Sequence, residues 1–497
     1  MSTIGSLIAG KPHDDTDRSS PVFDPSSGRQ SASVALADET LVDRAVTAAA
    51  DAFPAWRETS LSRRQRTLFE YRSLLRANAD RLAAVLTSEH GKTLEDARGE
   101  VSRGIEVVEY ACGLPELLKG EHSQQVSRGV DLHSTRHPIG VCVGITPFNF
   151  PVMVPLWMFP MAIAAGNTFV LKPSERDPSA SLLLAELFAE AGLPDGVLNV
   201  LQGDRVAVDA LLAHPDVAAV SFVGSTPVAR HVYATAAATG KRVQALGGAK
   251  NHMVVLPDAD LGAAADAAIS AGYGSAGERC MAISVVVAVG TAADGLVPLL
   301  EDRLGGLRVG DGMHPDTDMG PLITEQHRDR VAGYVERGLA EGAVAVADGR
   351  GSPVPDSGFF LGPTLLDHVE PWMEVYRDEV FGPVLSVVRV DDLAAALSLV
   401  NGNPYGNGAS IFTRSGAAAR MFQQEVTVGM LGVNIPIPVP LAFYSFGGWK
   451  DSRFGSDAIY GPEAVRFYTR AKVTTTRWPE PVDPGLDFGF SSQTADR

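Results

Sequence analysis

Between Asp38 and about Leu118 the apolar residues recur every three or four positions, in three groups. The recurring positions are Leu41, Val42, Ala45 and Ala49, then Leu68, Tyr71, Leu74 and Leu75, then Val101, Ile105, Val108 and Ala111. This spacing gives a helix one apolar face, so it predicts a layer of helices. Residues 1–33, which contain Pro21, Pro25 and a Ser-rich stretch, predict an irregular arm.

From Val141 onward, short apolar runs alternate with helical stretches. The predicted strands are residues 141–145, 168–171, 197–201, 219–223 and 242–246, and the predicted helices are residues 153–165, 179–191, 206–212 and 226–238. Buried strands that alternate with helices indicate a parallel, doubly wound sheet of the Rossmann type, which binds ligands at the carboxyl ends of its strands. The residues that follow these strand ends are 146–149, 172–175, 202–203 and 224–225. If a nucleotide cofactor binds, its phosphates should lie near residues 224–226, where a helix begins and offers free N–H groups.

A second α/β segment extends from about Gly248 to Phe446. Its predicted strands lie near residues 283–289, 384–390 and 410–412, and its predicted helices near residues 292–304, 325–341 and 393–400. Two further stretches alternate in polarity as strands do. Residues 125–136 predict a strand or hairpin, and residues 467–478 suit an exposed strand that pairs with another subunit.

The length of 497 residues exceeds what one hydrophobic core usually serves, so we expect at least two domains. The residues are 45% hydrophobic and 20% charged, as in an ordinary soluble globular protein. A net charge of −17 argues against nucleic acid or an anionic membrane surface as the main partner. Three scattered cysteines fit no disulfide framework, and no Cys/His cluster has zinc spacing, so we expect no metal and a reducing, cytoplasmic location.

We also expect neither a targeting leader nor a membrane span. Residues 1–11 have a brief apolar patch without a leading positive charge, unlike a secretory signal. Residues 151–171 are apolar enough to imitate a span, but Pro155, Pro160 and Gly166 divide them into pieces too short to cross a bilayer.

Candidate chemistry centres on Cys280, in the small-residue stretch 271–282. Small residues let another molecule approach closely, and the neighbouring cation Arg279 favours the thiolate, which is the form that attacks a carbonyl carbon. A buried structural cysteine is the alternative. A G-x-G-x-x-G match begins at Gly272 but follows a helical stretch, so we reject it as a phosphate loop. We expect its glycines to leave room for a nicotinamide and a carbonyl beside the sulfur.

Six motifs now stand in the order seen in aldehyde dehydrogenases. They are residues 144–151, 171–175, 192–200, 222–225, 277–280 (Gly-Glu-Arg-Cys) and 379–383. Together they resemble that family over about residues 20–475. Residues 248–252, 277–282, 433–440 and 467–469 resemble its CoA-acylating methylmalonate-semialdehyde dehydrogenase branch.

The resemblance implies an α/β fold with a Rossmann-type NAD-binding domain, a second α/β catalytic domain and a small β oligomerisation element. The implied ranges are 1–122 and 140–247, then 248–446, then 123–139 and 467–497. The terminal strand and the hairpin at residues 125–136 suggest a homodimer or homotetramer. By position, Cys280 resembles the nucleophile, and the Asn149 side-chain amide and the Cys280 N–H resemble the oxyanion donors. Taken alone, Asn149 would more readily be interpreted as a turn residue between Phe148 and Phe150.

The implied NAD contacts are Thr146, Phe148, Lys172, Glu175, Ser225, Glu379 and Phe381. Lys172 and Glu175 resemble the pair that grips the adenine-side ribose, and a carboxylate there would repel the 2′-phosphate of NADP. Glu379 and Phe381 resemble contacts to the nicotinamide ribose, and Ser225 a contact to the pyrophosphate. The alternatives are a solvated turn at residues 172–175 and simple core packing of Phe381.

One departure from the family pattern bears on the second half of the reaction. Hydrolytic members carry a glutamate, in Glu-Leu-Gly-Gly-Lys, that activates the deacylating water. Here that position holds Leu246 or Ala245, depending on the alignment, and neither can take a proton. A thioacyl enzyme would therefore wait for a thiol such as coenzyme A. Glu278 is a weaker candidate for a replacement base.

The resemblance also implies the substrate. Arg103 and Arg279 resemble the carboxylate-binding arginines of the branch, although Arg103 could instead pair with Glu100 or Glu106 on its own helix. We expect oxidation of methylmalonate or malonate semialdehyde, decarboxylation, and transfer to coenzyme A to give propionyl-CoA or acetyl-CoA. The rivals are a hydrolytic semialdehyde dehydrogenase and a catalytically silent binding or scaffold protein of the same fold.

Overall fold

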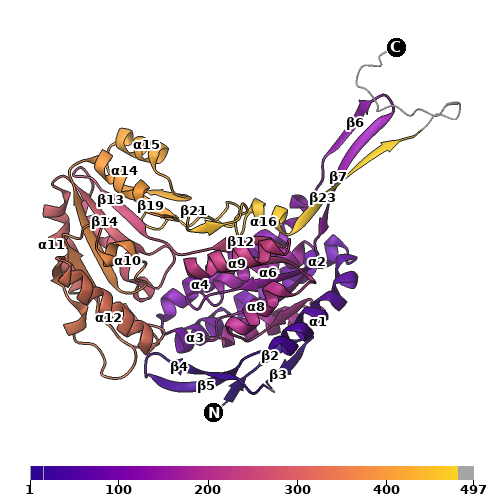
Figure 1. Ribbon diagram of the computed structural model, residues 1–497, viewed down its shortest axis with the longest axis horizontal. Helices are drawn as coiled ribbons and strands as arrows, with labels where there is room; N and C mark the ends of the chain where they lie inside the picture. Colours follow the sequence, from indigo (N-terminus) through magenta and orange to yellow (C-terminus); the bar gives the residue numbers. More distant parts are fainter. Residues whose placement is uncertain (1, 15, 479–497) are drawn as a thin grey trace.

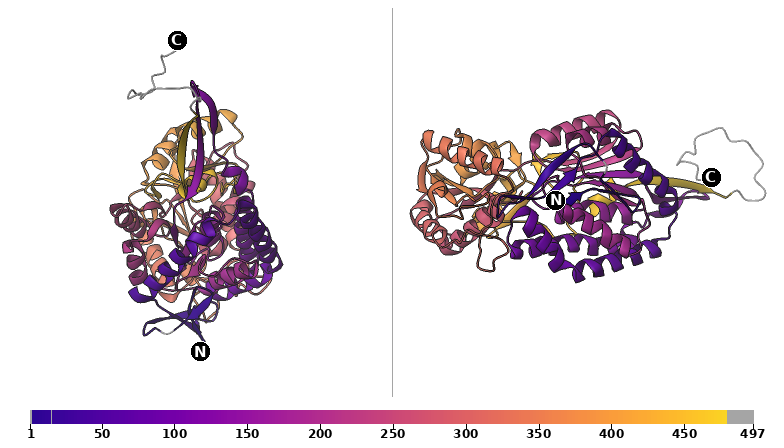
Figure 2. Two further views of the ribbon diagram at one scale, coloured as in Figure 1. Left: turned by 90° about the vertical axis from the view of Figure 1, so that its right-hand side faces the viewer. Right: turned by 90° about the horizontal axis from the view of Figure 1, so that it is seen from below.

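Two large sheets, each covered by helices, organise residues 2–14 and 16–478, which are the residues that the computed structural model describes (Figure 1). Seen from below in Figure 2, the two helix-covered sheets lie side by side. A three-stranded arm extends from the body on the side away from the second sheet (Figure 1). None of the helices in the described residues combines the length and apolarity needed to cross a membrane.

The first sheet has eight strands. In spatial order they are β22 (Arg453–Phe454), β12 (Arg242–Leu246), β11 (Val217–Val223), β8 (Val141–Ile145), β9 (Thr168–Lys172), β10 (Leu198–Val200), β2 (Ser6–Ile8) and β3 (Lys11–His13). The strands from β12 to β10 pair in parallel. Helices α1 (Glu39–Arg57), α8 (Arg205–Ala213) and α9 (Thr226–Ala238) share one core with this sheet. Helices α2 (Leu61–Ala77), α3 (Ala79–His90), α4 (Leu94–Cys112), α6 (Met153–Ala164) and α7 (Ser179–Glu190) share the other. The predicted doubly wound sheet is therefore confirmed.

The second sheet has seven strands with its own core. In spatial order they are β15 (Val344–Ala347), β16 (Thr364–Asp367), β17 (Val384–Val390), β14 (Ile283–Val289), β13 (Asn251–Val255), β19 (Gly408–Phe412) and β20 (Met430–Val433). The helices of this segment are α10 (Leu261–Tyr273), α11 (Ala292–Leu304), α12 (Glu325–Ala340), α13 (Glu374–Arg377), α14 (Leu393–Gly402) and α15 (Gly416–Glu425). Strands β13, β15, β16 and β20 were not predicted from the sequence. The domain limits 248–446 stay a prediction.

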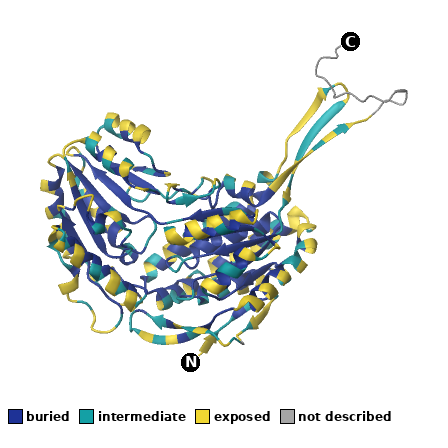
Figure 3. Cartoon of the chain, viewed as in Figure 1, coloured by how far each residue is buried: buried dark blue, intermediate teal, exposed yellow. Residues whose placement is uncertain are grey.

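The arm consists of β6 (His122–Ser127), β7 (Val130–Pro138) and β23 (Thr469–Arg477). Strand β23 pairs antiparallel with β7 along its whole length, from Thr469 opposite Pro138 to Arg477 opposite Val130. Most of its residues are exposed, as Figure 3 shows. The predicted hairpin and the predicted terminal strand are thus both present. Residues 479–497, assigned to the same element, lie outside the described residues.

The prediction of an irregular arm over residues 1–33 is wrong. This stretch contains β1 (Ser2–Ile4), β2, β3, β4 (Ser19–Asp24) and β5 (Arg29–Ala35). Strand β2 pairs with the distant β10 at the edge of the first sheet. Pro21 lies on β4, an edge strand, where a missing N–H costs nothing. Composition misled because these Pro- and Ser-containing residues form local pairs, β2 with β3 and β4 with β5, as well as the distant pair of β2 with β10.

Candidate active site

Cys280 lies between α10 and β14, at the end of a tightly folded segment. It is half-buried and forms no disulfide. Ser275 and Ala276 have φ values of 53° and 51°, and Gly277 has a φ of 74°. A Cβ on Gly277 would lie 2.2 Å from the carbonyl oxygen of Gly382. Glycine at position 277 is therefore required by a backbone contact with another loop, and the expectation that the glycines of this segment leave room for ligands stays a prediction.

The G-x-G-x-x-G match is not a phosphate loop. It begins in the last turn of α10 and continues into a short 3₁₀ turn, residues Gly274–Gly277. A dinucleotide fingerprint instead follows a strand and opens a helix. The rejection made from the sequence is confirmed.

Asn149 is brought against the nucleophile segment. It follows β8, and only 3% of its surface is exposed. Its Nδ2 donates a hydrogen bond of 3.0 Å to the carbonyl oxygen of Glu278, two residues before Cys280. A side-chain amide held there is suited to donating to an oxygen that develops charge beside the sulfur. Its role as an oxyanion donor stays a prediction.

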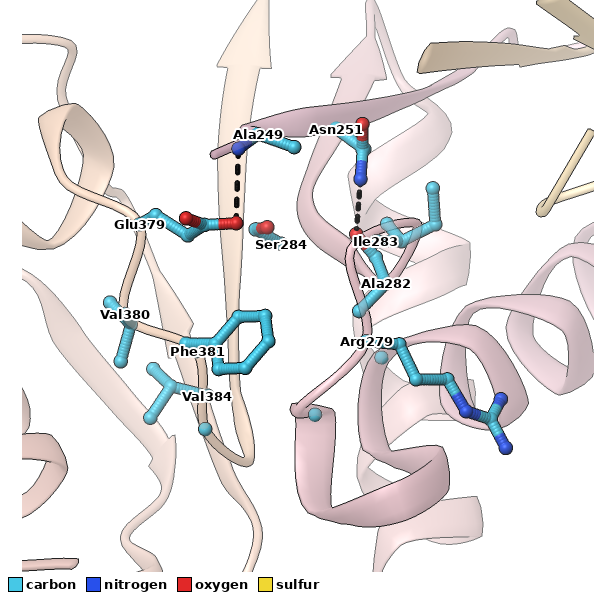
Figure 4. A pocket seen from close by; sticks show the side chains of 13 residues that line it. Ala249, Asn251, Arg279, Ala282, Ile283, Ser284, Glu379, Val380, Phe381 and Val384 are labelled. Atoms are coloured by element: carbon cyan, nitrogen blue, oxygen red, sulfur yellow. Dashed lines mark hydrogen bonds between the residues drawn. The ribbon is translucent and has the colours of Figure 1, made fainter. Parts of the chain in front are cut away.

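The electrostatics of Cys280 differ from the expectation. Burial, and to a smaller extent the Glu379 carboxylate, raise the pKa of the thiol to about 12, whereas Arg279 lowers it only weakly. Arg279 forms an ion pair with Asp96. Its side chain points away from Glu379 and Phe381 (Figure 4). Arg279 thus favours the thiolate in the predicted direction, but its effect is small beside that of burial, and its charge is already paired with Asp96.

Glu379 and Phe381 line one pocket with Arg279 and the residues that follow Cys280 (Figure 4). The Glu379 Oε1 accepts a hydrogen bond of 3.0 Å from the Ala249 N–H, and burial raises the pKa of this carboxyl to about 7. The Phe381 ring lies 5.9 Å from that of Phe148, edge to face. Two loops that extend from different sheets therefore meet here.

The remaining predicted cofactor residues lie at the carboxyl ends of the first sheet's strands. The Thr146 N–H donates to the Lys172 carbonyl oxygen at 3.1 Å, and Lys172 Nζ donates to Glu175 Oε2 at 3.2 Å. Burial raises the pKa of Glu175, but Lys172 and neighbouring groups lower it below the ordinary value overall. Glu175 is thus charged at neutral pH and can accept bonds from ribose hydroxyls.

Ser225 precedes α9 and forms no side-chain bond to that helix. The first N–H groups of α9 thus have no side-chain cap, an arrangement suited to phosphate oxygens. The next residue, Thr226, accepts a 2.8 Å bond at Oγ1 from the Gly248 N–H. A Cβ on Gly248 would lie 2.4 Å from Glu379 Oε2. Gly248 therefore lies between the candidate pyrophosphate contact at residues 225–226 and the candidate nicotinamide-ribose contact Glu379. This spacing fits one extended dinucleotide that reaches both.

The two candidate substrate arginines line different pockets. Arg103 borders a small pocket with Trp157 and Tyr460. It donates to Glu106 Oε2 at 2.7 Å and to the Pro440 carbonyl oxygen at 2.9 Å. Trp157 and Tyr460 belong to the hydrophobic core against which Cys280 also packs. The alternative of a pair between Arg103 and Glu106 is realised.

Glu278 is fully buried, and burial raises its pKa to about 8. Its Oε1 accepts from the Ile323 N–H at 3.3 Å and lies 3.4 Å from His327 Nε2. His327 in turn bonds the Phe381 carbonyl oxygen at 2.7 Å. The sequence analysis missed His327, which carries no motif. Through these contacts Glu278 connects the nucleophile loop with the segments that carry Ile323 and His327. The contacts indicate a structural role and do not support a role as base.

The position of the missing glutamate is apolar in the folded protein. Leu246 and Ala245 lie in β12, exposed by 3% and 0%. Gln244, the polar residue before them, bonds Ser221 inside the same sheet at 2.9 Å. None of these three side chains offers a group that could take a proton from water.

Comparisons with known proteins agree along the chain. The sequence profile of the aldehyde dehydrogenase family matches residues 13–474. A malonate-semialdehyde dehydrogenase of Pseudomonas aeruginosa is 56% identical over 496 residues, 99% of this chain and 100% of its own length. Malonate-semialdehyde dehydrogenase 2 of Geobacillus kaustophilus is 52% identical over 458 residues, 92% of this chain and 95% of its own length.

Solved structures give the same result. The crystal structure of methylmalonate-semialdehyde dehydrogenase from Oceanimonas doudoroffii superposes with a TM-score of 0.95 at 55% identity, covering 97% of this chain and 99% of that one. A Sinorhizobium meliloti structure described as a methylmalonate-semialdehyde dehydrogenase complexed with NAD has a TM-score of 0.96 at 50% identity, with coverage of 97% and 99%.

The electrostatics of Cys280 can be tested by alkylation of the ligand-free protein with iodoacetamide. The rate should rise without a plateau up to about pH 10, because the thiolate reacts and the pKa of Cys280 is raised. Glu379→Gln should speed alkylation at about pH 8 by roughly two- to tenfold, since it removes a charge that raises that pKa. Cys280→Ala provides the background rate. A plateau near neutral pH, or slower alkylation of Glu379→Gln, would contradict this account.

Proposed function

The chain belongs to the aldehyde dehydrogenase family, and from this premise we propose that it oxidises malonate or methylmalonate semialdehyde with NAD and transfers the product to coenzyme A. The observation that carries the acylating assignment is the buried apolar pair Ala245 and Leu246 at the position of the water-activating glutamate. The names of the similar proteins support the choice of semialdehyde.

In the proposed reaction, Cys280 Sγ attacks the aldehyde carbon and forms a thiohemiacetal. The Asn149 amide and the Cys280 N–H stabilise the charge on the former carbonyl oxygen, where loss of one such donor typically costs about 100- to 1,000-fold in rate. NAD, when bound, accepts the hydride. Lys172 and Glu175 would hold its adenine-side ribose, Ser225 and the start of α9 its phosphates, and Glu379 with Phe381 its nicotinamide ribose.

The second half of the reaction follows from the same residues. Once oxidised, Cys280 carries a thioester whose carbonyl lies beta to the substrate carboxylate. That carbonyl accepts the electron pair of the breaking carbon–carbon bond, so the carboxylate leaves as carbon dioxide, which water hydrates to bicarbonate. The thioester enolate left behind takes a proton from water at carbon and becomes the acetyl or propionyl group. The thiolate of coenzyme A then attacks the remaining acyl group and releases Cys280, because a thiolate needs less activation than water. The products are acetyl-CoA or propionyl-CoA. A reduced nucleophilic thiol favours a cytoplasmic location.

Dependence on coenzyme A can be measured as NADH formation from malonate semialdehyde. Without a thiol we expect a burst of about one NADH per active site followed by slow turnover, and with coenzyme A sustained turnover. Cys280→Ser should abolish both phases. Full turnover without any thiol would instead support the hydrolytic alternative. NAD binding without NADH formation from any aldehyde would support the silent scaffold.

Recognition of the substrate carboxylate is assigned to Arg103. Arg103→Leu should raise KM for malonate semialdehyde by about 10- to 100-fold and leave KM for propanal within about twofold, since only the former carries a carboxylate. Arg98→Leu on the same helix is a matched control, because Arg98 pairs with the exposed Asp80 at the surface. Equal losses on both aldehydes would show that Arg103 acts through the fold instead.

We also propose a homodimer or homotetramer joined through the arm. Strands β23 and β6 are the open edges of the arm, and Val473 on β23 is 65% exposed. Open edges with apolar side chains are ready to pair with another chain. Val473→Pro should lower the mass measured by light scattering towards the monomer, because it removes an edge donor. Val344→Pro, in the edge strand β15, is the control. An unchanged mass for Val473→Pro would exclude this interface.

A further inference from the structure

A buried ion pair lies directly beneath the Asn149 loop. Lys92, in the turn between α3 and α4, contacts Glu100 of α4 at 2.6 Å, and their side chains are 1% and 0% exposed. Two charges taken out of water cost several kcal/mol unless further hydrogen bonds satisfy them. The further hydrogen bonds of Lys92 and Glu100 therefore indicate which part of the chain the ion pair holds in place.

Among the described residues, the further side-chain hydrogen bonds of the pair all go to the segment 149–153. Lys92 Nζ donates to the Asn149 carbonyl oxygen at 2.6 Å and lies 4.6 Å from the centre of the Phe150 ring. Glu100 Oε1 accepts from the N–H groups of Val152 and Met153 at 2.8 and 3.1 Å. Helix α6 begins at Met153 without a side-chain cap of its own. Glu100 thus caps α6 from another helix, where a negative charge is favourable.

We propose that Lys92 and Glu100 are positioning residues for Asn149. The pair fixes the backbone of the loop at the Asn149 carbonyl and at the start of α6. Because the backbone of Asn149 is held in this way, its side-chain amide stays directed at the Glu278 carbonyl oxygen, close to the nucleophile in sequence. The inference rests on the proposed function in one respect, the role of Asn149 as oxyanion donor.

The size of the effect follows from geometry. Oxyanion donors work only when they lie within hydrogen-bond reach of where the charge develops. A misplacement of about 1 Å can cost on the order of 100-fold in rate. Without the pair, the loop keeps its sequence and its Asn149 but loses three charge-assisted bonds. We therefore expect an effect on kcat, with KM for NAD nearly unchanged.

A double-mutant cycle tests the proposal on the full chain with NAD, malonate semialdehyde and coenzyme A. Lys92→Met and Glu100→Gln should each lower kcat by about 10- to 100-fold and leave KM for NAD within about twofold. In an Asn149→Ala background, the same substitutions should cost less than about twofold, because no amide is left to misplace. Glu100→Gln keeps an acceptor for the start of α6, so it decides the question if Lys92→Met does not fold.

The matched control is Arg389→Met, which leaves the nearly buried Asp367 without its 2.7 Å partner in the second sheet. It should lower the melting temperature and leave kcat within about twofold. Equal losses of kcat in the wild-type and Asn149→Ala backgrounds would overturn the positioning role. So would an unchanged kcat in folded Glu100→Gln. An unchanged kcat in Asn149→Ala alone would instead remove Asn149 from the proposed function.

Discussion

The site depends on close contacts between three loops around Cys280, which carry Asn149, Gly277 and Gly382. Gly277 approaches the Gly382 carbonyl so closely that a Cβ would lie 2.2 Å from its oxygen. From the other side, the Asn149 amide bonds the carbonyl of Glu278 at 3.0 Å. These contacts join a loop of the first sheet to two loops of the second. Because close-packed contacts tolerate little movement, the nucleophile and its neighbours are held in one arrangement.

This arrangement buries carboxyl groups around the sulfur, at a cost in stability. Burial raises the pKa values of Glu278 and Glu379 to about 8 and about 7, from an ordinary 4.5. The folded protein therefore binds more protons than the unfolded chain between about pH 4.5 and 8. Stability from these groups is present below that window and is lost as pH rises through it. Local strain and unfavourable burial of this kind are typical of functional sites.

The sequence predicted the repeated elements well and the contacts between them poorly. Strands β8, β12 and β17 and helix α9 begin and end where the pattern placed them, because an apolar period depends on nearby residues alone. The N-terminal strands were missed, since the Pro- and Ser-rich composition conceals the local pairs β2–β3 and β4–β5 and the distant pair β2–β10. Arg279 was assigned an influence on the sulfur from adjacency in sequence. Its pairing with Asp96, 183 positions away, could not be read from local pattern.

The sequence by itself determined the alternating α/β order, the candidate nucleophile and the absence of an acid at residues 245–246, since residue type and period suffice for each. Only the tertiary structure decided which charges are free. It paired Arg279 with Asp96, placed Arg103 in a separate pocket, and buried Lys92 and Glu100 beneath Asn149. The physical reason is that burial and pairing set the energy of a charge, and both depend on residues brought together from distant parts of the chain.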